Sequence, residues 1–119
     1  MNVDNRIESL TPEAQIVCRR WLNVIKILDI DARITETLRS AERQAELVKD
    51  GASSTLHSKH LLGLAWDYAV YNAGVYITDG TDWRYQLCGL VGKALGCRWP
   101  IHLASGAVDA DHLQLEESS

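Results

Sequence analysis

The chain has 119 residues, of which 46% are hydrophobic and 24% are charged, and its formal net charge is −4. This composition is typical of a globular domain, and the length suffices for a single hydrophobic core. Lysine and arginine are scattered and no apolar run approaches the length of a membrane span. We therefore expect neither a nucleic-acid partner nor insertion into a membrane.

The organisation predicted from these properties is one domain over residues 1–119, present as a monomer. Residues 1–6 are polar and contain no apolar segment of the kind found in a signal peptide, so we expect synthesis in the cytoplasm without an export signal. The three cysteines lack the spacing of a metal or redox motif, and we interpret them as reduced core residues (Cys18, Cys88, Cys97).

The first half of the chain predicts two helices and a strand. A hydroxyl cap followed by proline and an acid predicts a helix from Pro12 to about Leu28. Residues 32–37 alternate and are rich in β-forming types, which predicts a short strand. Ser40 can cap a second helix, Ala41–Lys49, which Asp50-Gly51 would end.

The second half predicts a loop at residues 52–60 and a strand from Gly63 to Val70. A turn at residues 71–74 would lead into a second strand, 75–78. Thr81 or Asp82 would open a third helix that ends at Gly96, with its apolar face formed by Leu87, Leu90, Val91, Ala94 and Leu95. A loop over 101–108 and a last strand at 112–115 complete the chain. We predict an α+β fold, with about three helices packed on a small, mainly antiparallel sheet.

Two histidines and a carboxylate predict a metal site at the sheet face. Asp67 interrupts an otherwise apolar strand and shares one face with the small Ala65 and Ala69. Gly63 would let the chain turn so that His60 folds back toward Asp67, and His112 lies on the polar face of the last strand. Two histidines and one carboxylate hold catalytic zinc and leave a position open for water. We therefore predict that one Zn²⁺ binds to His60, Asp67 and His112.

Further polar residues could complete a hydrolytic site. Asp109, three residues before His112, could take a proton from metal-bound water, and Asp111 could do so in its place. Arg39 could stabilise an oxyanion. Residue type alone favours surface or capping roles for Arg39, Gln44 and Ser58. His57 and His102 are interpreted as structural or solvated, although His57 could substitute as a ligand.

The pattern Ser58-x-His60-x-x-Gly63-x-Ala65-x-Asp67, followed by Asp109-x-x-His112, resembles a family of zinc peptidases. This family contains the D-Ala-D-Ala carboxypeptidases and L-alanyl-D-glutamate endopeptidases, including small phage endolysins. The resemblance extends upstream to residues 34–40, Gln44 and Gly51, and downstream to residues 87–99. It covers roughly Leu10 to Leu115.

The resemblance implies a role for each matching residue. His60, Asp67 and His112 match the zinc ligands, Asp109 matches the catalytic acid/base, and Arg39 matches the arginine that stabilises the transition state. Ser58 and Gln44 match positions near the substrate cleft. The family cleaves peptide bonds in the stem peptides of bacterial peptidoglycan. The implied protein is a phage endolysin without a separate cell-wall-binding domain, and it would reach the wall after another protein has permeabilised the membrane.

One departure affects the expected cleft. Family members often have Trp-Gly-Gly after the third helix, whereas Trp99 is followed here by Pro100-Ile101-His102. The choice of bond is therefore open between an L-alanyl-D-glutamate endopeptidase and a D-alanyl-D-alanine carboxypeptidase or dipeptidase. The ligand set would also suit a catalytically silent cell-wall-binding module, or an Fe(II) oxygenase, since the same ligand types hold iron. The few predicted strands disfavour the oxygenase.

Overall fold

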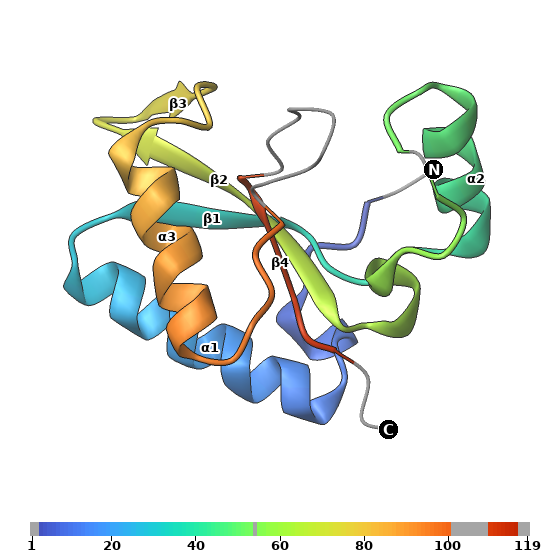
Figure 1. Ribbon diagram of the computed structural model, residues 1–119, viewed down its shortest axis with the longest axis horizontal. Helices are drawn as coiled ribbons and strands as arrows, with labels where there is room; N and C mark the ends of the chain where they lie inside the picture. The colour runs from blue at the N-terminus through green and yellow to red at the C-terminus, as the bar shows by residue number, and fades with distance from the viewer. Residues whose placement is uncertain (1–2, 54, 101–109, 117–119) are drawn as a thin grey trace.

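The computed structural model describes residues 3–53, 55–100 and 110–116, and its centre is a four-stranded antiparallel sheet (Figure 1). Strand β2 (Ala65–Asn72) lies in the middle and pairs along one edge with β1 (Asp31–Glu36). Along its other edge, β2 pairs with β4 (His112–Gln114) at its beginning and with β3 (Val75–Ile77) at its end. The predicted α+β class with a small antiparallel sheet is confirmed.

In the described part of the chain, three α-helices accompany the sheet: α1 (Pro12–Ile27), α2 (Ala41–Lys49) and α3 (Trp83–Ala94). Two 3-10 helices, η1 (Ile7–Ser9) and η2 (Lys59–Leu62), precede α1 and β2. Figure 1 shows α1 and α3 together on one side of the sheet, whereas α2 lies at the far end of the molecule from β3. Within the described ranges, no helix combines the length and the apolar character that a membrane span requires.

The core lies between the sheet and helices α1 and α3. Trp66 and Tyr68 point from β2 into this core and contact Trp21 of α1, with ring centroids 6.0 Å and 4.7 Å from the Trp21 ring. The Trp21 indole N–H donates to the carbonyl oxygen of Cys88 in α3 at 2.9 Å. Because side chains alternate along β2, Asp67 faces the opposite side of the sheet, as predicted.

The predicted helix caps are present. Thr11 Oγ1 accepts a hydrogen bond from Ala14 N, and Ser40 Oγ accepts one from Arg43 N. At the third helix the cap is Asp82 rather than Thr81. These local bonds satisfy backbone N–H groups that have no partner inside the helix, so the helix starts could be predicted from sequence.

Several predicted boundaries near the site were wrong. The segment containing His60 is the 3-10 helix η2 rather than a loop, and Ser58 caps it. Gly63 takes a left-handed conformation (φ 69°) as the C-cap of η2, so β2 begins at Ala65 instead of Gly63. Pairing with β1 and β3 extends β2 to Asn72, which confines the turn to residues 73–74. The loop predicted over 101–108 lies outside the described residues.

The predicted apolar face of α3 is confirmed in part, because Leu87, Val91 and Leu95 are partly buried and pack against the core. Tyr85, Cys88, Gly89 and Gly92 are buried, whereas Leu90 is exposed. Glycine permits close approach here: a Cβ on Gly92 would lie 2.5 Å from the Leu113 side chain of β4. Small residues therefore make close contacts on this helix, which the spacing of its large apolar residues could not indicate.

Candidate metal centre

The three predicted metal ligands converge although they come from different elements. Asp67 of β2 and His112 of β4 are direct partners in the antiparallel ladder, and His60 arrives from η2. One ligand atom from each residue can be chosen so that all three lie within 4.8 Å of one another. This group could hold a metal ion at the sheet.

The turn between η2 and β2 places His60. The left-handed Gly63 is packed closely against the chain before α1, where a Cβ would lie 3.3 Å from Thr11 N. Gly63 O also accepts a hydrogen bond from Thr11 N at 3.0 Å. A side chain at residue 63 would therefore meet both a strained backbone and a backbone neighbour, which explains why glycine suits this turn.

The hydrogen bonds of His60 show which of its two ring nitrogens could bind a cation. His60 Nδ1 lies 2.6 Å from the carbonyl oxygen of Thr37, which can only accept, so Nδ1 carries the hydrogen. In neutral His60 the lone pair of Nε2 then faces Asp67 Oδ1 at 3.1 Å. Two lone pairs directed at one another need a cation or an added proton between them, and the donor set suits a zinc ion.

Asp67 is the residue that both histidines share. Its Oδ1 lies 2.8 Å from His112 Nδ1 as well as 3.1 Å from His60 Nε2. Burial acts to raise the pKa of the Asp67 carboxyl, but the contacts with His112 and His60 outweigh burial and hold that pKa well below its usual range. Asp67 therefore offers an anionic oxygen to a cation at neutral pH.

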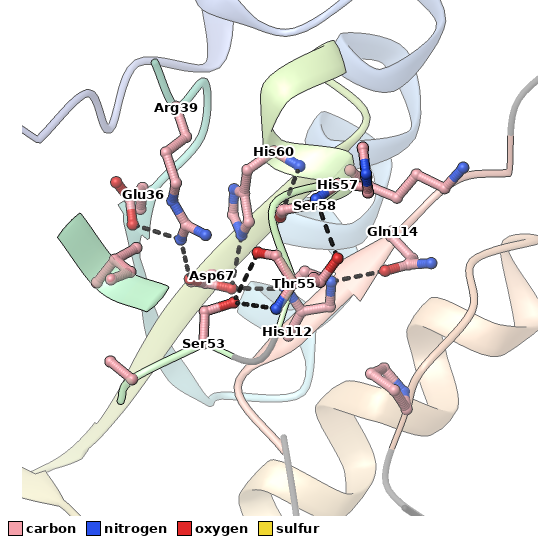
Figure 2. A pocket seen from close by; sticks show the side chains of 14 residues that line it. Glu36, Arg39, Ser53, Thr55, His57, Ser58, His60, Asp67, His112 and Gln114 are labelled. Carbon is pink, nitrogen blue, oxygen red and sulfur yellow. Dashed lines mark hydrogen bonds and ion pairs between the residues drawn. The ribbon is translucent and has the colours of Figure 1, made fainter. Parts of the chain in front are cut away.

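Arg39 contacts the second oxygen of the same carboxylate. It follows β1 and is buried, and its Nη2 donates to Asp67 Oδ2 at 3.4 Å and to Glu36 Oε1 at 2.6 Å. Its Nη1 donates to Gln44 Oε1 at 2.9 Å. Arg39 thus occupies the outer oxygen of Asp67 and leaves Oδ1 to the histidines (Figure 2).

Glu36 is a site residue to which the sequence analysis gave no role. Glu36 is only 5% exposed, and its carboxylate accepts from Arg39 Nη2 and also from Arg43 Nε at 2.5 Å. Burial acts to raise the pKa of Glu36, but hydrogen bonds from Arg43 and Arg39 hold that pKa below its usual value. The available signal was an acid at the end of a strand, followed three and seven residues later by arginines.

The two residues predicted to lie near substrate have different surroundings. Gln44 is fully buried in α2, where its amide donates to Thr55 O at 2.5 Å and to Ser53 Oγ at 3.0 Å, so it ties Arg39 to the loop after α2. Ser58 lines the cavity and its Oγ accepts from His60 N. Contact of either side chain with substrate stays a prediction.

A cavity of about 500 Å³ opens onto the cluster. His57, Ser58 and Arg39 line it together with His60, Asp67 and His112, as Figure 2 shows. His57 lines the cavity without belonging to the group that could bind a metal.

Asp109 and His102 lie outside the described residues, so the predicted acid/base role of Asp109 stays a prediction. The carbonyl oxygen of Ala110, the residue that follows, accepts from Tyr68 Oη at 2.7 Å and from Trp99 Nε1 at 3.2 Å.

The fold and the site together define the class of this protein: it is a small α+β domain in which two histidines and an aspartate lie close together at an antiparallel sheet. The chain belongs to the phage L-alanyl-D-glutamate peptidase family, which its sequence matches over residues 1–90. That match includes His60 and Asp67 but ends before His112, whose placement comes from the structure.

Individual relatives agree with this membership. An L-alanyl-D-glutamate peptidase of Listeria phage A118 is 32% identical over 113 residues, which make up 91% of this chain and 38% of that protein. The chain therefore spans well under half the length of this relative.

Solved structures are also similar to this one. The L-Ala D-Glu endopeptidase ChiX of Serratia marcescens superposes with a TM-score of 0.78 at 27% identity, covering 92% of this chain and 83% of ChiX. The L,D-carboxypeptidase DacB of Streptococcus pneumoniae gives a TM-score of 0.63 at 16% identity, over 90% and 66% of the two chains. The likeness to DacB shows a shared fold alone.

Proposed function

We propose that this protein is a zinc-dependent peptidase that hydrolyses the bond between L-alanine and D-glutamate in peptidoglycan stem peptides, acting as a phage endolysin. The observation that carries the proposal is the convergence of His60, Asp67 and His112 on one point beside a cavity, in a chain of this family. The similarity to ChiX, named as an L-Ala D-Glu endopeptidase, favours this bond over the D-alanyl-D-alanine bond.

The ligand roles follow from the donor atoms. His60 would bind through Nε2, Asp67 through Oδ1 and His112 through Nδ1. When bound, zinc supplies a Lewis acid and lowers the pKa of its water to about 7. With three protein ligands, a fourth position remains for that water or for a substrate carbonyl oxygen.

Two further residues would handle protons and charge. Asp109 would take the proton of the attacking water on its carboxylate and give it to the leaving amine nitrogen of D-glutamate. Arg39 keeps a second Nη1 hydrogen after bonding to Gln44, and it would donate this hydrogen to the carbonyl oxygen as negative charge develops there. Ser58, which lines the cavity, would contact the stem peptide, and the buried Gln44 would act by holding Arg39 and the loop at Thr55 in place.

A muropeptide digest tests the proposal. Purified protein is incubated with muropeptides of known sequence, with a chelator and then with zinc restored, and the fragments are weighed by mass spectrometry. We expect zinc-dependent cleavage that leaves L-alanine on the muramoyl side and D-glutamate as the new amino terminus. Release of free D-alanine alone would instead identify a carboxypeptidase.

Matched variants separate metal binding from turnover. His60→Ala should lose the zinc equivalent, whereas His57→Ala, a change three residues away in the same cavity, should retain it because His57 lies outside the cluster. Asp109→Ala should keep zinc and lose hydrolysis. If the parent protein hydrolyses no muropeptide, and Asp109→Ala keeps both zinc and the biological activity of the parent, the non-catalytic binding module is the better interpretation. The requirement for a separate membrane-permeabilising protein stays a prediction.

A further inference from the structure

Gln114 lies beside the metal cluster and had no predicted role. It follows His112 by two residues on β4, so the two side chains share one face of the sheet, and both line the cavity. Gln114 Oε1 lies 2.9 Å from His112 Nε2, the ring nitrogen that points away from Asp67 (Figure 2).

A second contact supports this orientation of the Gln114 amide. Its Nε2 donates to Glu116 Oε1 at 3.3 Å, which turns Oε1 toward the His112 ring. An amide oxygen only accepts, so His112 Nε2 must be the donor and must carry the hydrogen. The lone pair of neutral His112 is then on Nδ1, the atom that lies 2.8 Å from Asp67 Oδ1.

Without an acceptor at Nε2, the other tautomer of His112 would compete with metal binding. Asp67 Oδ1 is within hydrogen-bond distance of His112 Nδ1, so a proton on Nδ1 would join two of the three ligands to each other. Gln114 stabilises the opposite tautomer, in which Nε2 holds the hydrogen. It also anchors the far edge of the ring, while the backbone carbonyl of Thr37 plays the corresponding part for His60.

We propose that Gln114 is a positioning residue for the metal centre: its amide oxygen holds His112 as the Nε2–H form and presents Nδ1 to the ion. This inference rests on the proposed metal-binding function of the cluster. Partners of this kind orient ligating histidines and raise their basicity. The backbone of Gln114 has a separate task, since its N and O bond to Arg98 O and N at 3.2 Å and 2.8 Å. A side-chain substitution therefore leaves the strand pairing in place.

Zinc affinity, measured by competition with a chromophoric chelator, tests the proposal. Gln114→Met keeps the side-chain length and removes the acceptor, and we expect about 10- to 100-fold weaker zinc binding. Gln114→Glu keeps an acceptor oxygen and should bind zinc at least as tightly as the parent protein. Gln86→Met is the matched control, because the Gln86 amide donates to Gly80 O away from the cluster. Its zinc affinity should equal that of the parent.

Nitrogen-15 NMR of the zinc-loaded protein gives a second readout that a purely structural role would not change. We expect a His112 Nε2–H resonance, protected from exchange with water, in the parent and in Gln114→Glu, and its loss through exchange in Gln114→Met. Unchanged affinity and an unchanged resonance in Gln114→Met would overturn the proposal, as would tenfold weaker binding in Gln114→Glu. If the parent itself binds no zinc, the proposed function fails as well.

Discussion

Glu36→Gln tests the buried charge network behind Asp67. The Glu36 and Arg39 side chains are only 7% and 8% exposed, and the Glu36 carboxylate accepts hydrogen bonds from both Arg39 and Arg43. The substitution removes the negative charge and turns an amide N–H₂ toward the arginines. Breaking a buried pair by changing one partner typically costs about 3–5 kcal/mol of the free energy of unfolding. Arg43 is 25% exposed and can hydrate, and Asp67 remains near Arg39, so we expect a loss near the lower limit, about 3 kcal/mol.

Urea unfolding of the metal-free proteins, followed by tryptophan fluorescence, measures this loss. The control is Asp31→Asn, which removes an ion pair to Arg33 whose side chains are about half exposed, and its midpoint should match the parent. Because the pKa of folded Glu36 is lowered, its contribution is present above the usual carboxyl range and is lost as the pH falls through the folded value. The difference in the free energy of unfolding between the parent and Glu36→Gln should therefore become smaller in acid. If Glu36→Gln and Asp31→Asn have the same urea midpoint at neutral pH, the reasoning is refuted.

Two further predictions concern the core. Burial raises the pKa of the Cys18 and Cys88 thiols to about 12, so a thiol reagent at pH 8 should modify neither residue in the native protein and both after denaturation; rapid native labelling would contradict their burial. Gly89→Ala would place a Cβ 1.9 Å from the Trp99 ring, so we expect about 1–3 kcal/mol of destabilisation in urea unfolding. An unchanged midpoint would show that Trp99 does not pack against this face of α3.

Local signals predicted most of the fold. Helix α2 was predicted with its observed bounds, because Ser40 and Asp50-Gly51 mark its ends through short-range hydrogen bonds and turn chemistry. The start of β2 was wrong by two residues, because a 3-10 helix of four residues leaves little periodicity to detect. The packing face of α3 was predicted only in part, because glycines, which carry no hydrophobic signal, also lie on it in close contact with Trp99 and Leu113.

The sequence also predicted which three polar residues come together, but not which neighbouring side chains hold them in place. Asp67 stood out as a carboxylate in an apolar strand, and alternation placed it on the face opposite the core. The contacts of Glu36 with Arg43 and of Gln44 with the loop at Thr55 depend on how α2 is placed in space. Such contacts have no periodicity along the chain, so residue spacing alone could not assign them.

The most direct test of the metal centre is a crystal structure of the protein grown with zinc, with anomalous diffraction measured at the zinc edge. The account predicts one strong peak about 2.0–2.2 Å from His60 Nε2, Asp67 Oδ1 and His112 Nδ1. A peak bound elsewhere, or a His112 ring reversed to coordinate through Nε2, would contradict it.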